Sequence, residues 1–136
     1  MPSVADELAA RVRRFAIRIV KFARAMSRDG INEIVVRQLA KAATSASANY
    51  SAARRGRSRA EFIAKLGVVV EEADETEHWL KVLMEVDVPM TSALRQELEW
   101  LIDEASKLRA IFVASVKTAR KNTKGRNSNR KEKSPQ

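Results

Sequence analysis

The sequence contains no cysteine, and its 136 residues include only 3 prolines, 4 glycines and one histidine. Without cysteine there is no disulfide framework, no zinc–thiolate site and no cysteine nucleophile. The scarcity of proline and glycine leaves few residues that interrupt helices. We therefore expect long helices, in a chain of the length that forms one domain with its own core.

Long apolar runs and nucleotide-binding motifs are also missing. No segment approaches the roughly 20 apolar residues that a membrane-spanning helix needs, and the N-terminus lacks the features of a secretory signal. Neither a P-loop nor a GxGxxG pattern occurs, so nucleotide hydrolysis has no support. We expect a cytoplasmic protein that has no membrane partner.

Positive charge is concentrated near the C-terminus. The chain has 26 Lys and Arg against 17 Asp and Glu, a formal net charge of +9. Residues 117–136 contribute +7 of this, from eight basic residues and one acid, whereas residues 1–116 contribute +2. From residue 122 onward no apolar residue is present to offset the entropic cost of ordering. We predict a folded domain over residues 1–121 and a disordered basic tail over 122–136.

Four segments carry apolar residues three or four positions apart, which is the period of an amphipathic helix. They predict helices over residues 4–28, 31–55, 59–86 and 91–121, with Gly30 as the C′ residue that ends the first and Ile31 as the first apolar position of the second. Ser3 and Ser58 are the expected N-caps. Short connections place consecutive helices antiparallel. The predicted fold is all-α, an antiparallel up-down-up-down four-helix bundle.

Three of these helices have more apolar residues than one core requires. Extra positions include Ile17 and Val20 in the first helix, Val68 in the third and Trp100 in the fourth. Scattered exposed apolar residues are normal, but a surplus on three helices favours self-association. We expect a homo-oligomer.

The segment 42–62 reads AATSASANYSAARRGRSRAEF, which is rich in small residues and then abruptly basic. Its alanines and serines allow close approach of neighbouring backbones. Asn49, if buried, must be hydrogen-bonded and would fix the register of one helix against another. Tyr50 adds bulk with a polar tip.

The motifs A-A-x-S-x-x-A-N-Y from Ala42, S-x-x-E-F-x-x-K-L from Ser58 and E-E-A-D-E-x-x-x-W-L from Glu71 occur in this order. In combination they resemble the four-helix bundle proteins known as the 23S rRNA intervening-sequence protein family, over roughly residues 35–85. The family often has Glu and Gly shortly after the Asn, where this chain has Ala52 and Ala53.

The resemblance implies a homopentamer of four-helix bundles with no established enzymatic activity. A similar protein, the accessory variability determinant of diversity-generating retroelements, forms a basic pentameric barrel that binds nucleic acid and a reverse transcriptase. The resemblance therefore implies nucleic acid, and a reverse transcriptase or another protein, as partners beside further copies of the chain.

Three groups of basic residues are candidates for contacting phosphates. They lie along one side of the first helix, around Gly56 and toward the C-terminus, and each is also compatible with an ordinary solvated surface. Because the last group lacks aromatic residues, base stacking is not available within it. The candidates are Arg11, Arg14, Arg18, Lys21, Arg54, Arg55, Arg57, Arg59, Lys117, Arg120, Lys121, Lys124 and Arg126.

An acidic run in the third helix is better suited to holding arginines of a neighbouring helix or subunit than to catalysis. Glu75 and His78 form one Glu-x-x-His pair, but a di-iron site needs two such pairs and this chain has one histidine. We expect no metal, no cofactor and no catalytic residue. The candidate structural or interface residues are Asn49, Tyr50, Glu71, Glu72, Asp74, Glu75 and Trp79.

The sequence thus predicts a non-enzymatic nucleic-acid-binding or ribonucleoprotein accessory protein, with RNA favoured over DNA. One alternative is a protein-interaction scaffold whose basic surface docks an acidic partner. A second alternative is a metal-binding bundle.

Overall fold

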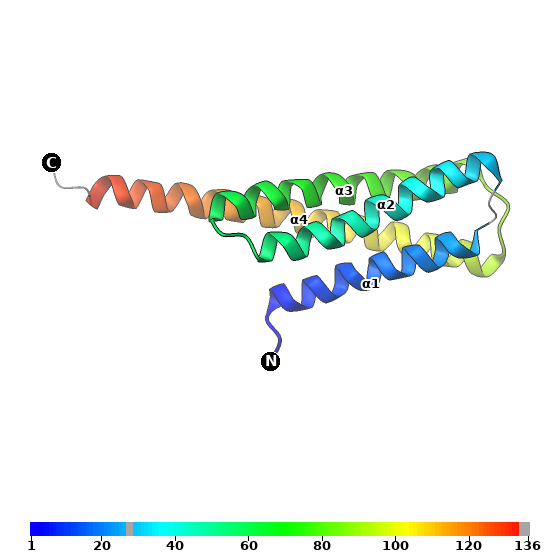
Figure 1. Cartoon of the computed structure of the whole chain (residues 1–136), viewed down its shortest axis with the longest axis horizontal. Coiled ribbons are helices and arrows are strands. Elements are labelled where there is room, and N and C mark those ends of the chain that lie inside the picture. Colours follow the sequence, from blue (N-terminus) through cyan, green and yellow to red (C-terminus); the bar gives the residue numbers. More distant parts are fainter. Residues whose placement is uncertain (27–28, 134–136) are drawn as a thin grey trace.

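The computed structural model describes residues 1–26 and 29–133, with side chains up to residue 125. Within these ranges the chain forms four α-helices and no strand: α1 (Val4–Ala25), α2 (Gly30–Arg54), α3 (Arg59–Val86) and α4 (Ser92–Lys133). The α2–α3 turn lies at one end of the bundle, and the other two connections lie at the opposite end (Figure 1). The all-α four-helix prediction is confirmed.

Serine caps begin α1 and α3, as the sequence predicts. The backbone N–H of Asp6 donates to Ser3 Oγ, and the N–H of Ser3 donates to the Asp6 carboxylate, each at 3.0 Å. At α3, the N–H of Glu61 donates to Ser58 Oγ at 3.1 Å. These bonds satisfy N–H groups that the first turn of a helix leaves without partners.

The connection between α1 and α2 differs from the prediction for Gly30. α1 ends at Ala25, and Gly30 is the first residue of α2 rather than the last cap of α1. Gly30 does not have the positive φ that a C′ glycine adopts. Asp29 caps α2 instead, because its carboxylate accepts the N–H of Asn32 at 2.9 Å.

The core lies along the predicted apolar seams, with one exception. Ile19, Leu39, Leu66 and Leu101 are completely buried, whereas Ile31, predicted to begin the seam of α2, is 76% exposed. Ile31 lies in the first turn of α2. Further along α2, Val36 and Leu39 enter the core in its place.

The bundle closes at the α2–α3 turn around an aromatic pair. The Tyr50 ring of α2 packs against the Phe112 ring of α4, with centroids 5.3 Å apart at 50°. Phe112 is completely buried and Tyr50 is nearly so. The small residues of α2, such as Ala43 and Ala46, are buried beside them and let α2 lie close to its neighbours.

The last helix is longer than predicted. α4 continues past residue 121 to Lys133 and projects beyond the α2–α3 turn (Figure 1). The predicted disorder from residue 122 is not confirmed. Lys and Arg are good helix formers, and no proline interrupts the segment before Pro135. Residues 134–136 lie outside the described part of the chain.

None of the helices in the described ranges is both long enough and apolar enough to cross a membrane.

Candidate nucleic-acid interface

Two of the four residues on the predicted basic face of α1 form ion pairs with α4. Arg11 donates Nε and Nη2 to the two carboxylate oxygens of Glu104, at 3.0 and 2.5 Å. Arg18 binds Glu97 in the same two-pronged way, at 2.9 and 2.8 Å. Such bidentate pairs are the stronger and more directional of the charge-assisted hydrogen bonds. These two arginines therefore hold α1 against α4 and are not free for phosphate.

Arg18 also has an aromatic partner. Its guanidinium carbon lies 3.4 Å from the centroid of the Trp100 ring, a cation–π contact. Hydrogen bonds to Glu97 raise the pKa of Arg18, and those to Glu104 raise the pKa of Arg11. Of the predicted face on α1, Arg14 and Lys21 are exposed and form no ion pair with a described residue.

The arginines around Gly56 divide into one structural and three available residues. Arg54 forms an ion pair with Asp6 at 2.5 Å, which joins the end of α2 to the start of α1. This hydrogen bond, with those from Ser3, lowers the pKa of Asp6 to about 2. Arg55 and Arg57 are exposed and Arg59 is half-buried. None of these three forms an ion pair with a described residue.

Four more available cations lie on α4 where it passes the α2–α3 turn. Lys117, Arg120, Lys121 and Lys124 are all exposed. No acidic residue occurs on α4 between Glu104 and Glu132. The side chain of Arg126 lies outside the described part.

A groove lies between the start of α3, directly after the turn, and this part of α4. It has a volume of about 490 Å³, and we call it the turn groove. Its lining comes from the start of α3 and from α4: Arg59, Phe62, Ile111, Ala114, Ser115, Thr118, Ala119 and Asn122. We call the cations of the turn, the start of α3 and this part of α4 the basic end, which comprises Arg55, Arg57, Arg59, Lys117, Arg120, Lys121 and Lys124.

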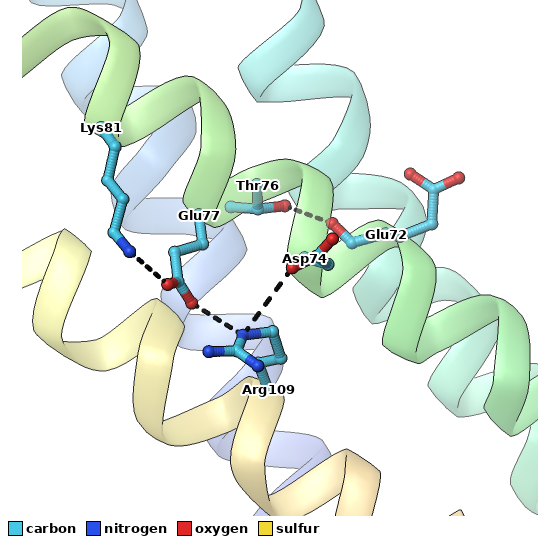
Figure 2. A network of polar contacts seen from close by, with 6 residues as sticks. All are labelled: Glu72, Asp74, Thr76, Glu77, Lys81 and Arg109. Carbon is cyan, nitrogen blue, oxygen red and sulfur yellow. Dashed lines mark hydrogen bonds and ion pairs between the residues drawn. The ribbon is translucent and has the colours of Figure 1, made fainter.

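The acidic run of α3 contacts α4 through Glu77, the last member of the run. Glu77 is buried and accepts hydrogen bonds from Arg109 Nε at 2.9 Å and from Lys81 Nζ at 2.7 Å (Figure 2). Asp74 lies 3.8 Å from the same Arg109 nitrogen. Burial by itself would raise the pKa of Glu77, but the bonds from Arg109 and Lys81 lower it.

The other members of the acidic run have different surroundings. Glu71 is exposed. Glu72 is half-buried, and burial together with nearby Glu75 raises its pKa. Glu75 accepts a hydrogen bond from Trp79 Nε1 at 3.2 Å, and the Trp79 ring meets the His78 ring edge-on at 4.9 Å. No cluster of metal-ligating side chains occurs among the described residues.

Asn49 is only half-buried, and among the described residues its side-chain hydrogen bonds stay within α2, so the register role predicted for a buried Asn49 has no support within one chain. Its Nδ2 donates to the backbone oxygen and the hydroxyl of Ser45, at 2.9 and 3.0 Å, one turn earlier in α2. A mid-helix amide can satisfy itself in this local way, so it sets no interhelical register here.

A signal for Glu97 and Glu104, which sequence reasoning did not identify, was present in the sequence. Arg11 and Arg18 are seven residues apart, and so are Glu97 and Glu104. Seven residues are close to two helical turns, so each pair projects from one side of its helix. Glu77 lies four residues after Ala73 and three before Leu80, which places it on the core side of α3.

The chain matches a known protein family over most of its length. The model of the 23S rRNA-intervening sequence protein family matches residues 7–111. The chain therefore belongs to this family, and the resemblance drawn from its motifs is confirmed. No curated protein matches the chain.

A solved structure shares the fold. It is a protein of unknown function from the S23 ribosomal protein family of Bacteroides thetaiotaomicron VPI-5482, with a TM-score of 0.71 and 26% sequence identity. The match covers 81% of this chain and 98% of that one. Neither the family nor this neighbour is identified as an enzyme.

Proposed function

We propose that the protein is a non-enzymatic accessory protein that binds the phosphate backbone of nucleic acid, with RNA favoured, at its basic end. The observation that carries the proposal is that seven cations gather at one end of the bundle, whereas several other arginines are held by carboxylates. Arg11, Arg18, Arg54 and Arg109 form ion pairs with carboxylates of neighbouring helices. The cations of the basic end gather where two helices and a turn meet, and they form no ion pair with a described residue.

This arrangement suits a polyanion better than a small acidic ligand. The available cations are spread over a turn and several turns of a helix, so they can contact successive phosphates. Phosphate contacts of this kind give affinity with little sequence preference. The RNA preference is supported by the family description, which associates these proteins with intervening sequences of 23S rRNA.

We also propose that copies of the chain associate. A second groove of about 470 Å³ lies between α1 and α2, where Ile17, Val20 and Ala48 present apolar surface and Arg13, Lys21 and Arg24 add positive charge. Ile17 is 46% exposed, an unusual environment for an isoleucine. The exposed carboxylates of α3 in a second copy would complement these cations. A homopentamer is the assembly that the family resemblance implies.

A salt series tests the proposed function. The affinity of the full chain for a labelled structured RNA and a labelled duplex DNA would be measured by fluorescence anisotropy. If the seven cations of the basic end each meet a phosphate, the logarithm of affinity should fall with the logarithm of salt concentration at a slope of about −6 for the duplex and about −5 for single-stranded segments. An absence of binding at moderate salt would reject the proposal and favour an acidic protein partner instead.

A further inference from the structure

Phosphate binding does not account for the turn groove. Its lining is mostly apolar, through Phe62, Ile111, Ala114 and Ala119, and it also includes Arg59 of the basic end. Its volume of about 490 Å³ falls within the range of small-ligand pockets, roughly 300–1,000 Å³. An apolar recess that is lined by one arginine and lies next to the basic end is suited to a flat, uncharged group attached to a phosphate chain.

The lining offers what recognition of a nucleobase requires. Phe62 is half-buried, and the core behind it holds its ring in place. Aromatic side chains are the usual surfaces on which unpaired bases stack. Arg59 lies beside Phe62 and can meet the phosphate or stack on the base.

Polar groups at the same groove can contact a base edge. Ser115 donates its hydroxyl hydrogen to the Ile111 carbonyl at 2.9 Å, so its oxygen is left as an acceptor. Asn122 is exposed at the groove and carries both a donor and an acceptor. Asn122 therefore matches the mixed hydrogen-bonding edges of nucleobases.

We infer that the turn groove receives an unpaired nucleobase, so that the protein prefers RNA with a bulge or loop over a continuous duplex. A paired base is stacked inside the helix and cannot enter the groove. This inference rests on the proposed function, since the cations of the basic end hold the flanking phosphates.

The test compares two RNAs bound by the full chain. One is a labelled perfect duplex, and the other is the same duplex with an internal bulge of unpaired uridines. We expect the bulged RNA to bind about tenfold more tightly, which is the effect of stacking one base. Phe62→Leu keeps an apolar side chain but removes the aromatic ring, and should reduce the preference to about twofold without changing the affinity for the perfect duplex.

A second variant avoids dependence on the packing of Phe62. Asn122 is exposed, so Asn122→Ala leaves the fold intact and should lower the affinity for the bulged RNA alone, by several-fold. Equal binding of both RNAs by the unaltered chain would overturn the inference but leave the proposed function standing. A bulge preference that both variants retain would also overturn it, because the base would then lie elsewhere. Failure to bind either RNA would overturn both proposals.

Discussion

The carboxylate of Glu104 on α4 is held by both Nε and Nη2 of Arg11 on α1, at 3.0 and 2.5 Å. Glu104 is buried, and Arg11 is about one-third exposed. The neighbouring pair of Arg18 with Glu97 repeats this arrangement two turns away. Contacts of α1 with α4 are sparser than its contacts with α2. The two pairs therefore specify much of how α1 is seated against α4.

Arg11→Ala should destabilise the bundle, because it leaves the buried Glu104 carboxylate without a partner. We expect a loss of about 1–3 kcal/mol in the free energy of unfolding, measured by urea denaturation. Arg14→Ala is the matched control, since Arg14 is exposed and unpaired, and should change stability by less than about 0.5 kcal/mol. Equal effects of the two substitutions would contradict a stabilising role for the pair.

Glu77 makes stability depend on acidity. Its folded-state pKa lies below the ordinary value of 4.5, so its contribution is present above pH 4.5 and is lost as the pH falls through the lower, folded-state pKa. Glu77→Gln removes the charge that Arg109 and Lys81 share (Figure 2). We expect a loss of about 1–3 kcal/mol at neutral pH.

The same substitution should flatten the decline in stability below pH 4.5, because Gln does not titrate. Urea denaturation at a series of pH values measures both effects. If the stability of the variant falls with acid as steeply as that of the unaltered protein, a group other than Glu77 causes the decline.

Ile17→Lys tests the proposed association through the groove between α1 and α2. Lysine adds charge to an apolar patch already bordered by cations, so the assembly should dissociate toward monomers. The mass is measured by light scattering after size exclusion. Ile31→Lys is the control, because Ile31 is 76% exposed and does not line the groove. A mass unchanged by Ile17→Lys, or an unaltered protein that is itself monomeric, would reject this proposal.

Much of the fold was predictable because apolar spacing and serine caps are local signals. The seam of α3 and the caps at Ser3 and Ser58 follow directly from them. The end of α4 was less predictable, because the same basic composition suits either a solvated helix or a disordered tail. Gly30 was assigned to the wrong helix, since the competing N-cap signal of Asp29 was overlooked.

The candidate site was predictable only in part. The sequence identified the cations, but it could not show which of them form ion pairs with carboxylates, because partners such as Arg11 and Glu104 are 93 residues apart. The equal seven-residue spacings could have indicated those pairs. The turn groove had no such signal in the sequence, because residues of two different helices, such as Phe62 and Thr118, line it together.

Removing the residues after Gly125 should weaken nucleic-acid binding without abolishing it. The truncation deletes Arg126, Arg130, Lys131 and Lys133, but it keeps the turn groove and every cation of the basic end. We expect a several-fold loss of affinity in the anisotropy assay, with a shallower salt dependence. Complete loss of binding would instead locate the binding activity in the deleted segment.

Two double variants of equal charge test most directly whether nucleic acid binds at the basic end. Arg55→Ala with Arg57→Ala removes two cations at the basic end, and Arg14→Ala with Lys41→Ala removes two exposed cations of α1 and α2 that line neither groove. RNA affinity is measured by anisotropy at one moderate salt concentration. We expect the first pair to lower the RNA affinity by about tenfold or more and the second pair by no more than about twofold. Equal losses in both would contradict a localised interface and indicate a general effect of net charge.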